Sequence, residues 1–380
     1  MKTTMNFDII IDRRYSSAIK WEKYKGTDII PMWVADMDFP SSPSILKALH
    51  ERIDHGIFGY TQASDELYEL IISNLKTKYS WNIKKEWIVW LPGLVPGINV
   101  ACRTVGNEGD DVITHTPIYP PFLDAPSLAK RTLTKVPMVL HNDRWSIDYD
   151  RFIKAIKPNT KLFLLCSPQN PTGRVFDYTE LERLSNICRD HNLILCSDEI
   201  HCDLLLDENK LHIPTASINK TIEQNSITLM SPSKTYNIAG LGFSYAIIPN
   251  DLLRKGFQNV CNGILPYVNI LGYTAAIAAY KYSDDWLHDV LHYLRINRNI
   301  LEEHIDAMSG LSMTRIEATY LAWINVKALD LEDPVSYFEQ AGVGLLGGKV
   351  FGDKDYVRLN FGCPRSVLEK ALKRIKKTLS

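Results

Sequence analysis

Three short segments in the middle of the chain place reactive side chains beside apolar runs. The first is Ser231-Pro-Ser-Lys234-Thr-Tyr-Asn, where a lysine lies among small hydroxyl residues directly after an apolar run. A lysine amine that is removed from water loses proton affinity and becomes a usable nucleophile. Lys234 is therefore a candidate for Schiff-base chemistry, although an ordinary loop lysine is the better explanation of this segment when it is taken alone.

The other two segments carry an aspartate and an asparagine. In Cys196-Ser-Asp198-Glu-Ile-His201 an aspartate ends an apolar run, where burial costs free energy unless the carboxylate has a partner. A protonated pyridine nitrogen is one such partner, and a helix cap is the alternative. The segment Ser167-Pro-Gln-Asn170-Pro-Thr-Gly173 has the composition of a tight turn, but the amide of Asn170 could also donate to a phenolate oxygen.

These residues need a scaffold, and the central part of the chain predicts one. Apolar runs of strand length alternate with amphipathic runs of helix length, which favours a mainly parallel sheet flanked by helices. Ligands of such sheets gather at the carboxyl ends of the strands, where the polar segments fall. We expect strands at 87–91, 111–114, 161–166, 193–197, 226–230 and 243–248, and helices at 98–105 and 178–191.

The two ends of the chain do not show this alternation of strand-length and helix-length runs. Residues 1–45 show no alternation, and from about Asp284 the chain predicts a long charged helix over 286–308, followed by strands at 320–326 and 356–361. The fold class we expect is α/β. A large domain over 46–284 would be accompanied by a smaller α+β domain, built from the segment 1–45 and residues 285–380.

Composition excludes several classes of protein. The 380 residues are 45% apolar and 23% charged with a net charge of −1, which argues against a disordered chain and against nucleic-acid or membrane binding. No apolar run reaches the length of a transmembrane helix, and the first residues lack the apolar core of a secretory signal. The seven scattered cysteines contain no C-x-x-C pair, so we expect no metal site and a cytoplasmic location.

The order of the reactive residues is more specific than any one of them. Asn170-Pro-Thr-Gly173 precedes Asp198 by 28 positions (198 minus 170), and Lys234 follows 36 positions later (234 minus 198). This order resembles the signature of fold-type I pyridoxal-phosphate enzymes, the aminotransferase class I/II superfamily, along essentially the whole chain. Further segments look like the MalY/PatB group of cystathionine β-lyases: 11–14 with 20–21, 33–39, 59–61, 117–122, 234–241 and 357–361.

The resemblance implies a role for each reactive residue. Lys234 would form a Schiff base with pyridoxal 5′-phosphate and, once displaced by substrate, exchange a proton with its Cα atom. Asp198 would keep the pyridine nitrogen protonated, and Asn170 would hydrogen-bond the ring hydroxyl oxygen. Tyr119 would stack on the ring, and Arg358 would bind the substrate α-carboxylate.

The phosphate site rests on weaker signals. The backbone amides of Gly93, Leu94 and Val95 lie at a predicted helix N-terminus, which suits a phosphate. The hydroxyl groups of Ser231 and Ser233 could add donors. Tyr60 resembles a family tyrosine that reaches the phosphate from the neighbouring subunit, which implies a homodimer.

Two positions depart from many aminotransferases. Gly242 stands eight residues after the lysine, where those enzymes carry an arginine on the phosphate. His201 stands three residues after the aspartate, where they carry a tyrosine. A neutral His201 could donate to the ring oxygen or simply pack in the core. Both departures point away from an aspartate-type aminotransferase.

The expected activity is β-elimination on cystathionine or a related cysteine S-conjugate, releasing a thiol, pyruvate and ammonia. An aminotransferase is the alternative, because both reactions begin with loss of the Cα proton. A regulatory protein that binds a transcription factor is the alternative from a different class, although such a role would not require Lys234, Asp198, Asn170 and Arg358 together.

Overall fold

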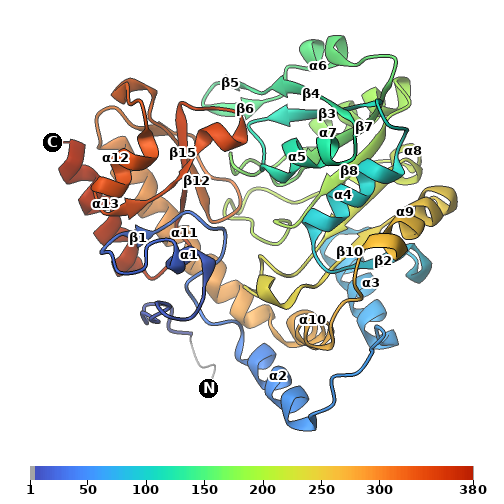
Figure 1. Cartoon of the computed structure of the whole chain (residues 1–380), viewed down its shortest axis with the longest axis horizontal. Coiled ribbons are helices and arrows are strands. Elements are labelled where there is room, and N and C mark those ends of the chain that lie inside the picture. The colour runs from blue at the N-terminus through green and yellow to red at the C-terminus, as the bar shows by residue number, and fades with distance from the viewer. Residues whose placement is uncertain (1–4, 380) are drawn as a thin grey trace.

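A seven-stranded sheet forms the centre of the molecule (Figure 1), which the computed structural model describes over residues 5–379. The strand order is β2-β10-β9-β8-β7-β3-β4, and β3, β4, β7, β8 and β9 pair in parallel. Strand β10 is antiparallel to both of its neighbours. The strands are β2 (Ile88–Leu91), β3 (Asp111–Thr116), β4 (Thr132–Pro137), β7 (Thr160–Cys166), β8 (Ile194–Asp198), β9 (Ser226–Met230) and β10 (Ser244–Ile247).

The central strands are apolar along most of their length because helices cover both faces of the sheet. Every residue of β9 is buried, and so is all of β7 apart from Lys161. The helices of this part are α2 (Pro43–His55), α3 (Asp65–Tyr79), α4 (Leu94–Thr104), α5 (Pro121–Leu128), α6 (Tyr149–Ala155), α7 (Tyr178–Asp190), α8 (Lys220–Gln224), α9 (Asp251–Ile264) and α10 (Ile270–Tyr282). A short hairpin joins β5 (Val139–His141) to β6 (Arg144–Ser146).

One predicted boundary is wrong in a way that matters for the site. The sequence places the first residue of a helix at Ile98, but α4 begins at Leu94, four residues earlier. Pro96 lies in the first turn, where a backbone N–H has no intrahelical partner and a proline is tolerated. The helix N-terminus therefore follows Gly93 directly, within reach of the carboxyl end of β2.

The two chain ends meet in a second, smaller structure. A four-stranded antiparallel sheet has the order β11-β12-β15-β14, and β1 (Ile30–Pro31) of the N-terminal segment pairs in parallel with β13 (Val343–Gly344). Figure 1 shows the blue N-terminal elements beside the orange and red C-terminal ones. The remaining elements are α1 (Ile19–Glu22), β11 (Ser312–Met313), β12 (Leu321–Asn325), β14 (Leu346–Gly347), β15 (Tyr356–Asn360), α11 (Asp284–Asp306), α12 (Pro334–Gln340) and α13 (Arg365–Leu379).

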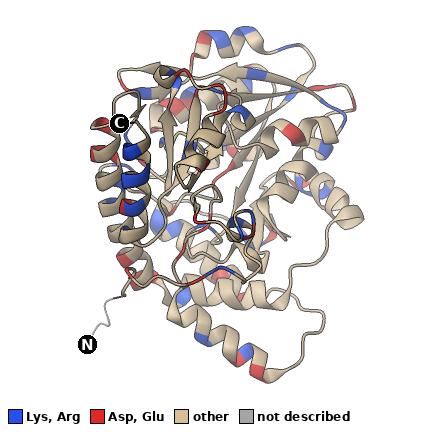
Figure 2. Ribbon diagram, turned by 60° about the vertical axis from the view of Figure 1, so that its left-hand side comes forward, with Lys and Arg blue, Asp and Glu red and all other residues tan. Residues whose placement is uncertain are grey.

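The predicted fold class, α/β with a mainly parallel sheet, is confirmed. The domain boundaries at 45/46 and 284/285 stay predictions. Figure 2 shows acidic and basic residues interspersed along the ribbon, with several basic residues on α13. Over residues 5–379, no helix is long and apolar enough to cross a membrane, and no group of three or more His, Cys, Asp or Glu side chains could hold a metal ion.

Candidate active site

Most of the residues predicted from the sequence line one cavity of about 360 Å³, where the central strands β2, β7 and β8 meet the small sheet. Ser231 and Tyr60 do not line it. The predicted residues that do are Gly93, Leu94, Val95, Tyr119, Asn170, Asp198, His201, Ser233, Lys234 and Arg358.

Lys234 lies four residues beyond the end of β9, and its amine faces the N-terminal segment. Its Nζ donates to the carbonyl oxygen of Ala35 at 2.6 Å. Burial, and to a smaller extent the positive charge of Arg358, lowers the pKa of Lys234 to about 8, although Asp36 and Asp198 act in the opposite direction. Near neutral pH the amine is therefore unprotonated far more often than an ordinary lysine, as a nucleophile or general base requires.

Asp198 is the last residue of β8, and its side chain is buried. Its Oδ1 accepts the backbone N–H of Ile200 at 3.1 Å. No Lys, Arg or His of the described chain lies within ion-pair distance of this carboxyl. Burial raises the pKa of Asp198 to about 7, which is the behaviour of a carboxyl that lacks a cationic partner.

His201 lies in the turn that follows β8, close to the same cavity. Burial, together with the nearby charges of Lys234 and Arg358, lowers its pKa to about 3, so the imidazole is neutral near pH 7. Its Nδ1 is buried and finds no hydrogen-bond partner among the residues described. A neutral ring with a free nitrogen can serve a bound ligand as donor or as acceptor.

Arg358 from the small sheet and Asn170 from the turn that follows β7 meet at the cavity wall. Arg358 lies on β15 and donates from Nη1 to Asn170 Oδ1 at 3.1 Å, and from Nη2 to the carbonyl oxygen of Trp33 at 2.9 Å. Its Nε has no partner in the described chain. Tyr119 lies between β3 and α5, and its phenol pKa is raised by burial, so it is neutral. The neutral phenol ring of Tyr119 can therefore stack its face against a flat ligand.

The start of α4 and Ser233 supply the remaining donors. The first backbone N–H groups of α4 have no intrahelical partners, and no side chain caps this helix. Ser231 differs, because its hydroxyl donates to the carbonyl oxygen of Phe243 at 2.7 Å. Tyr60 is fully exposed at 101% relative accessibility, so within one chain the structure does not bring it to the site.

The donor set fits pyridoxal 5′-phosphate. Asp198 is a buried carboxyl without a cationic partner, and a protonated ring nitrogen would supply one. The unpartnered His201 nitrogen and the amide of Asn170 would face the ring oxygen, and the α4 N-terminus would face the phosphate. Lys234 would bind the aldehyde carbon through its amine.

Several residues in the site are not found by motif reasoning. Trp33, Val34 and Ala35 bring the N-terminal segment to the cavity, and Leu346 brings β14. Ala35 contributes through its backbone carbonyl, which has no side-chain signature, and Leu346 has an ordinary apolar side chain. The sequence pattern indicated 33–39 as a family segment without showing what it contacts.

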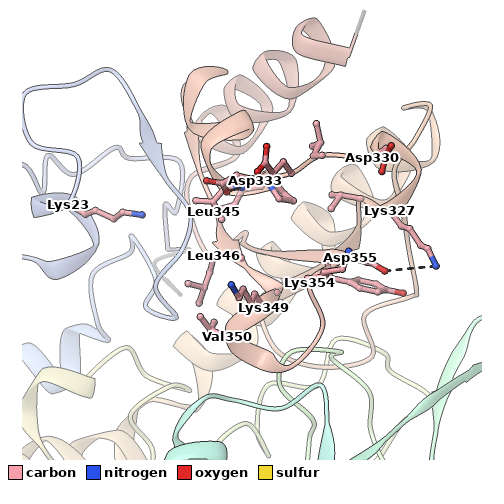
Figure 3. Close-up of a pocket in the computed structure, with 18 residues that line it drawn as sticks. Lys23, Lys327, Asp330, Asp333, Leu345, Leu346, Lys349, Val350, Lys354 and Asp355 are labelled. Atoms are coloured by element: carbon pink, nitrogen blue, oxygen red, sulfur yellow. Dashed lines mark hydrogen bonds and ion pairs between the residues drawn. The ribbon is translucent and has the colours of Figure 1, made fainter.

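Leu346 also lines a wider groove of about 1130 Å³ between the N-terminal segment and residues 326–356 (Figure 3). The amine of Lys23 points into this groove from one side, and Lys349 lies on the other. Lys327 and Asp355 form an ion pair of 4.0 Å at the far end. The groove and the candidate active site therefore share a wall at Leu346.

A lysine with a depressed pKa, an unpaired buried aspartate and a helix N-terminus at the carboxyl edge of a mainly parallel sheet define a pyridoxal-phosphate enzyme of fold type I. The sequence model of the aminotransferase class I and II family matches residues 27–375. The chain belongs to that family, and the resemblance found in the sequence is confirmed.

Comparison with individual proteins gives more specific similarities than the family match. The chain is 34% identical to cystathionine beta-lyase PatB of Bacillus subtilis over 99% of this chain and 100% of that protein. It is 32% identical to protein MalY of Escherichia coli, with 97% of each covered. Among solved structures, OvoB gives a TM-score of 0.97 at 45% identity with 99% of both chains covered. A PLP-bound C-S lyase from Staphylococcus hominis gives 0.92 at 34% identity, covering 100% of this chain and 99% of that one.

Proposed function

We propose that this protein is a pyridoxal-phosphate-dependent carbon–sulfur lyase that carries out β-elimination on cystathionine or a related cysteine S-conjugate. The products are a thiol, pyruvate and ammonia. The observation that carries the proposal is the shared cavity of Lys234, Asp198 and Arg358. The similarity to PatB and to the Staphylococcus hominis C-S lyase over the whole chain supports the lyase reaction in particular.

The proposed role of Arg358 is to bind the substrate α-carboxylate. A guanidinium group binds a carboxylate through two parallel hydrogen bonds, and Arg358 Nε is free to form one of them. Because burial and the contact to Asn170 fix the guanidinium plane, the carboxylate would be held in one orientation. That orientation determines which bond at Cα is aligned for cleavage.

The proposed role of Lys234 is to remove the Cα proton. Its depressed pKa lets the amine accept a proton near neutral pH, and the positive charge of Arg358 disfavours the ammonium form. Asp198 would hold a proton on the ring nitrogen, and Tyr119 would pack against the ring face. Bound pyridoxal phosphate supplies the conjugated ring that absorbs the electrons left at Cα, and a thiolate can then leave from Cβ.

The phosphate is proposed to bind the α4 N-terminus and Ser233, with Tyr60 contributed by a second copy of the chain. The full exposure of Tyr60 agrees with a role outside its own subunit. A homodimer is therefore part of the proposal, which also places the protein in the cytoplasm, as the cysteine usage suggests. Ser231 is a weaker candidate, because its hydroxyl already donates to Phe243.

The reaction is tested by following thiol release from purified protein loaded with the cofactor. Cystathionine and S-alkyl cysteines should each release thiol over many turnovers. Failure with every cysteine S-conjugate would contradict the proposal.

A further inference from the structure

The segment 33–38 lies against the active site and is held through its backbone carbonyl groups. Asn360 Nδ2 donates to the carbonyl oxygens of Val34 and Asp36, the latter at 2.6 Å. The Ala35 carbonyl between them accepts Lys234 Nζ and also the hydroxyl of Tyr320 at 3.1 Å. The position of the Ala35 oxygen therefore depends on how this segment is anchored.

The anchor includes a cluster of four charged side chains: Arg13, Lys20, Asp36 and Asp38, here called the ion quartet. Lys20 Nζ lies 2.7 Å from Asp38 Oδ2, although Lys20 is only 1% exposed. Arg13 bridges the two aspartates, at 2.7 Å from Asp36 Oδ2 and 2.6 Å from Asp38 Oδ1. Trp21 Nε1 adds a hydrogen bond of 3.3 Å to Asp38.

The ion quartet also holds the backbone directly. Lys20 Nζ donates to the carbonyl oxygen of Asp36 at 3.3 Å, and Arg13 Nη1 donates to that of Met37 at 3.3 Å. Asn237, three residues after Lys234, accepts the N–H of Met37 at 3.0 Å and donates to its carbonyl oxygen at 2.9 Å. Two cations balance two carboxylates, and Ala35 immediately precedes one of those carboxylates.

We propose that the ion quartet is a positioning device of the active site. It fixes the Ala35 carbonyl as the acceptor that holds the free Lys234 amine, and it neutralises Asp36 beside that amine. This inference rests on the proposed function, since it takes Lys234 as the catalytic amine. The quartet draws one charged residue, Arg13, from the segment 11–14, together with Lys20 and with Asp36 and Asp38 of the segment 33–39.

The sign of the electrostatic effect follows from the groups that face Lys234. These are Asp36 from the N-terminal segment, Asp198 and neutral His201 from β8 and its turn, Arg358 from β15, and the Tyr320 hydroxyl before β12. Asp36 raises the pKa of Lys234. Removing Arg13 leaves Asp36 less compensated and should raise that pKa further, whereas removing the Asp36 charge should lower it.

The test compares variants of opposite expected sign in the full-length protein. Arg13→Met removes the cation and keeps most of the side-chain length, Arg13→Lys keeps the charge, and Asp36→Asn removes the anion. Arg14→Met is the matched control, because the neighbouring Arg14 pairs with Asp12 at 2.8 Å on the surface. Two pH profiles are measured: kcat/KM for β-elimination, and acetylation of Lys234 by acetic anhydride in cofactor-free protein, read by mass spectrometry.

We expect the inflection of both pH profiles to move to higher pH in Arg13→Met and to lower pH in Asp36→Asn, each by about 0.5–1 pH unit. Arg13→Lys and Arg14→Met should keep the wild-type profile. Shifts of the same sign in both charge-removing variants, or no shift in folded protein, would overturn the proposal. If Arg13→Met fails to fold, the direction in which the Asp36→Asn inflection moves decides the test. Wild-type protein without lyase turnover would contradict the proposed function, while the acetylation profile would still test the ion quartet.

Discussion

Arg358 and Asn170, 188 residues apart in the chain, are joined by a hydrogen bond of 3.1 Å from Nη1 to Oδ1. Because an arginine can only donate, this contact identifies the Asn170 atom that accepts as the amide oxygen and leaves the NH₂ group free of Arg358. The residue proposed to bind the substrate carboxylate thus orients the residue proposed to bind the ring oxygen. The pair joins strand β15 of the small sheet to the turn that follows β7 of the central sheet.

Arg358→Ala should raise KM for cysteine S-conjugates by about 10- to 100-fold, because a charge-assisted contact to the carboxylate is lost. Steady-state kinetics measure the effect, and Arg295→Ala, which removes an arginine paired with Glu208 at 3.2 Å, is the control. An unchanged KM would place the carboxylate elsewhere.

Asp198 should make the stability of the cofactor-free protein fall as pH rises. Its pKa is about 7 in the folded protein against an ordinary value of 3.8, so between these pH values the folded state binds more protons than the unfolded state. The free energy of unfolding should therefore decrease as the pH rises through this window, and Asp198→Asn should lack this component.

Thermal unfolding of the two proteins at about pH 5 and pH 8, on either side of the folded-state pKa, measures this difference. Wild type should lose stability relative to Asp198→Asn at the higher pH. Loading the cofactor should reduce the loss, because a ring cation stabilises the ionised carboxyl. If the two proteins differ in stability by the same amount at both pH values, Asp198 does not titrate in this range.

Tyr60 is expected to act on the site of a second subunit. Tyr60→Ala and Lys234→Ala should each be impaired alone, but heterodimers formed by mixing them contain one site with both wild-type residues. Refolding an equal mixture should restore about a quarter of wild-type activity if the protein is a C₂ dimer. A mixture no more active than Tyr60→Ala alone would contradict a role across the interface.

The sequence could predict six of the seven central strands because most of them are apolar runs, and their carboxyl ends could be predicted from the polar segments that follow. It brought Lys234, Asp198 and Asn170 to one place for that reason. Strand β4 was missed, because Thr132–Pro137 is largely polar and mostly not buried. The start of α4 was predicted four residues too late, because Pro96 can occupy the first turn of a helix without a backbone N–H.

Other features of the candidate active site cannot be predicted from a single sequence. The Ala35 oxygen is a backbone atom, and the ion quartet depends on long-range pairing of Arg13 and Lys20 with Asp36 and Asp38. The place of Tyr60 requires a second chain. In each case the missing information is a contact between distant segments or subunits rather than the type of residue.

The most direct test of the lyase proposal is the stoichiometry of pyruvate and thiol released from L-cystathionine without added keto acid. The measurement is made on wild type and on Lys234→Ala, both incubated with pyridoxal phosphate. We predict many turnovers of wild type with equal amounts of pyruvate and thiol, and none for Lys234→Ala. A single turnover of wild type that resumes only when a keto acid is added would contradict the account and identify an aminotransferase.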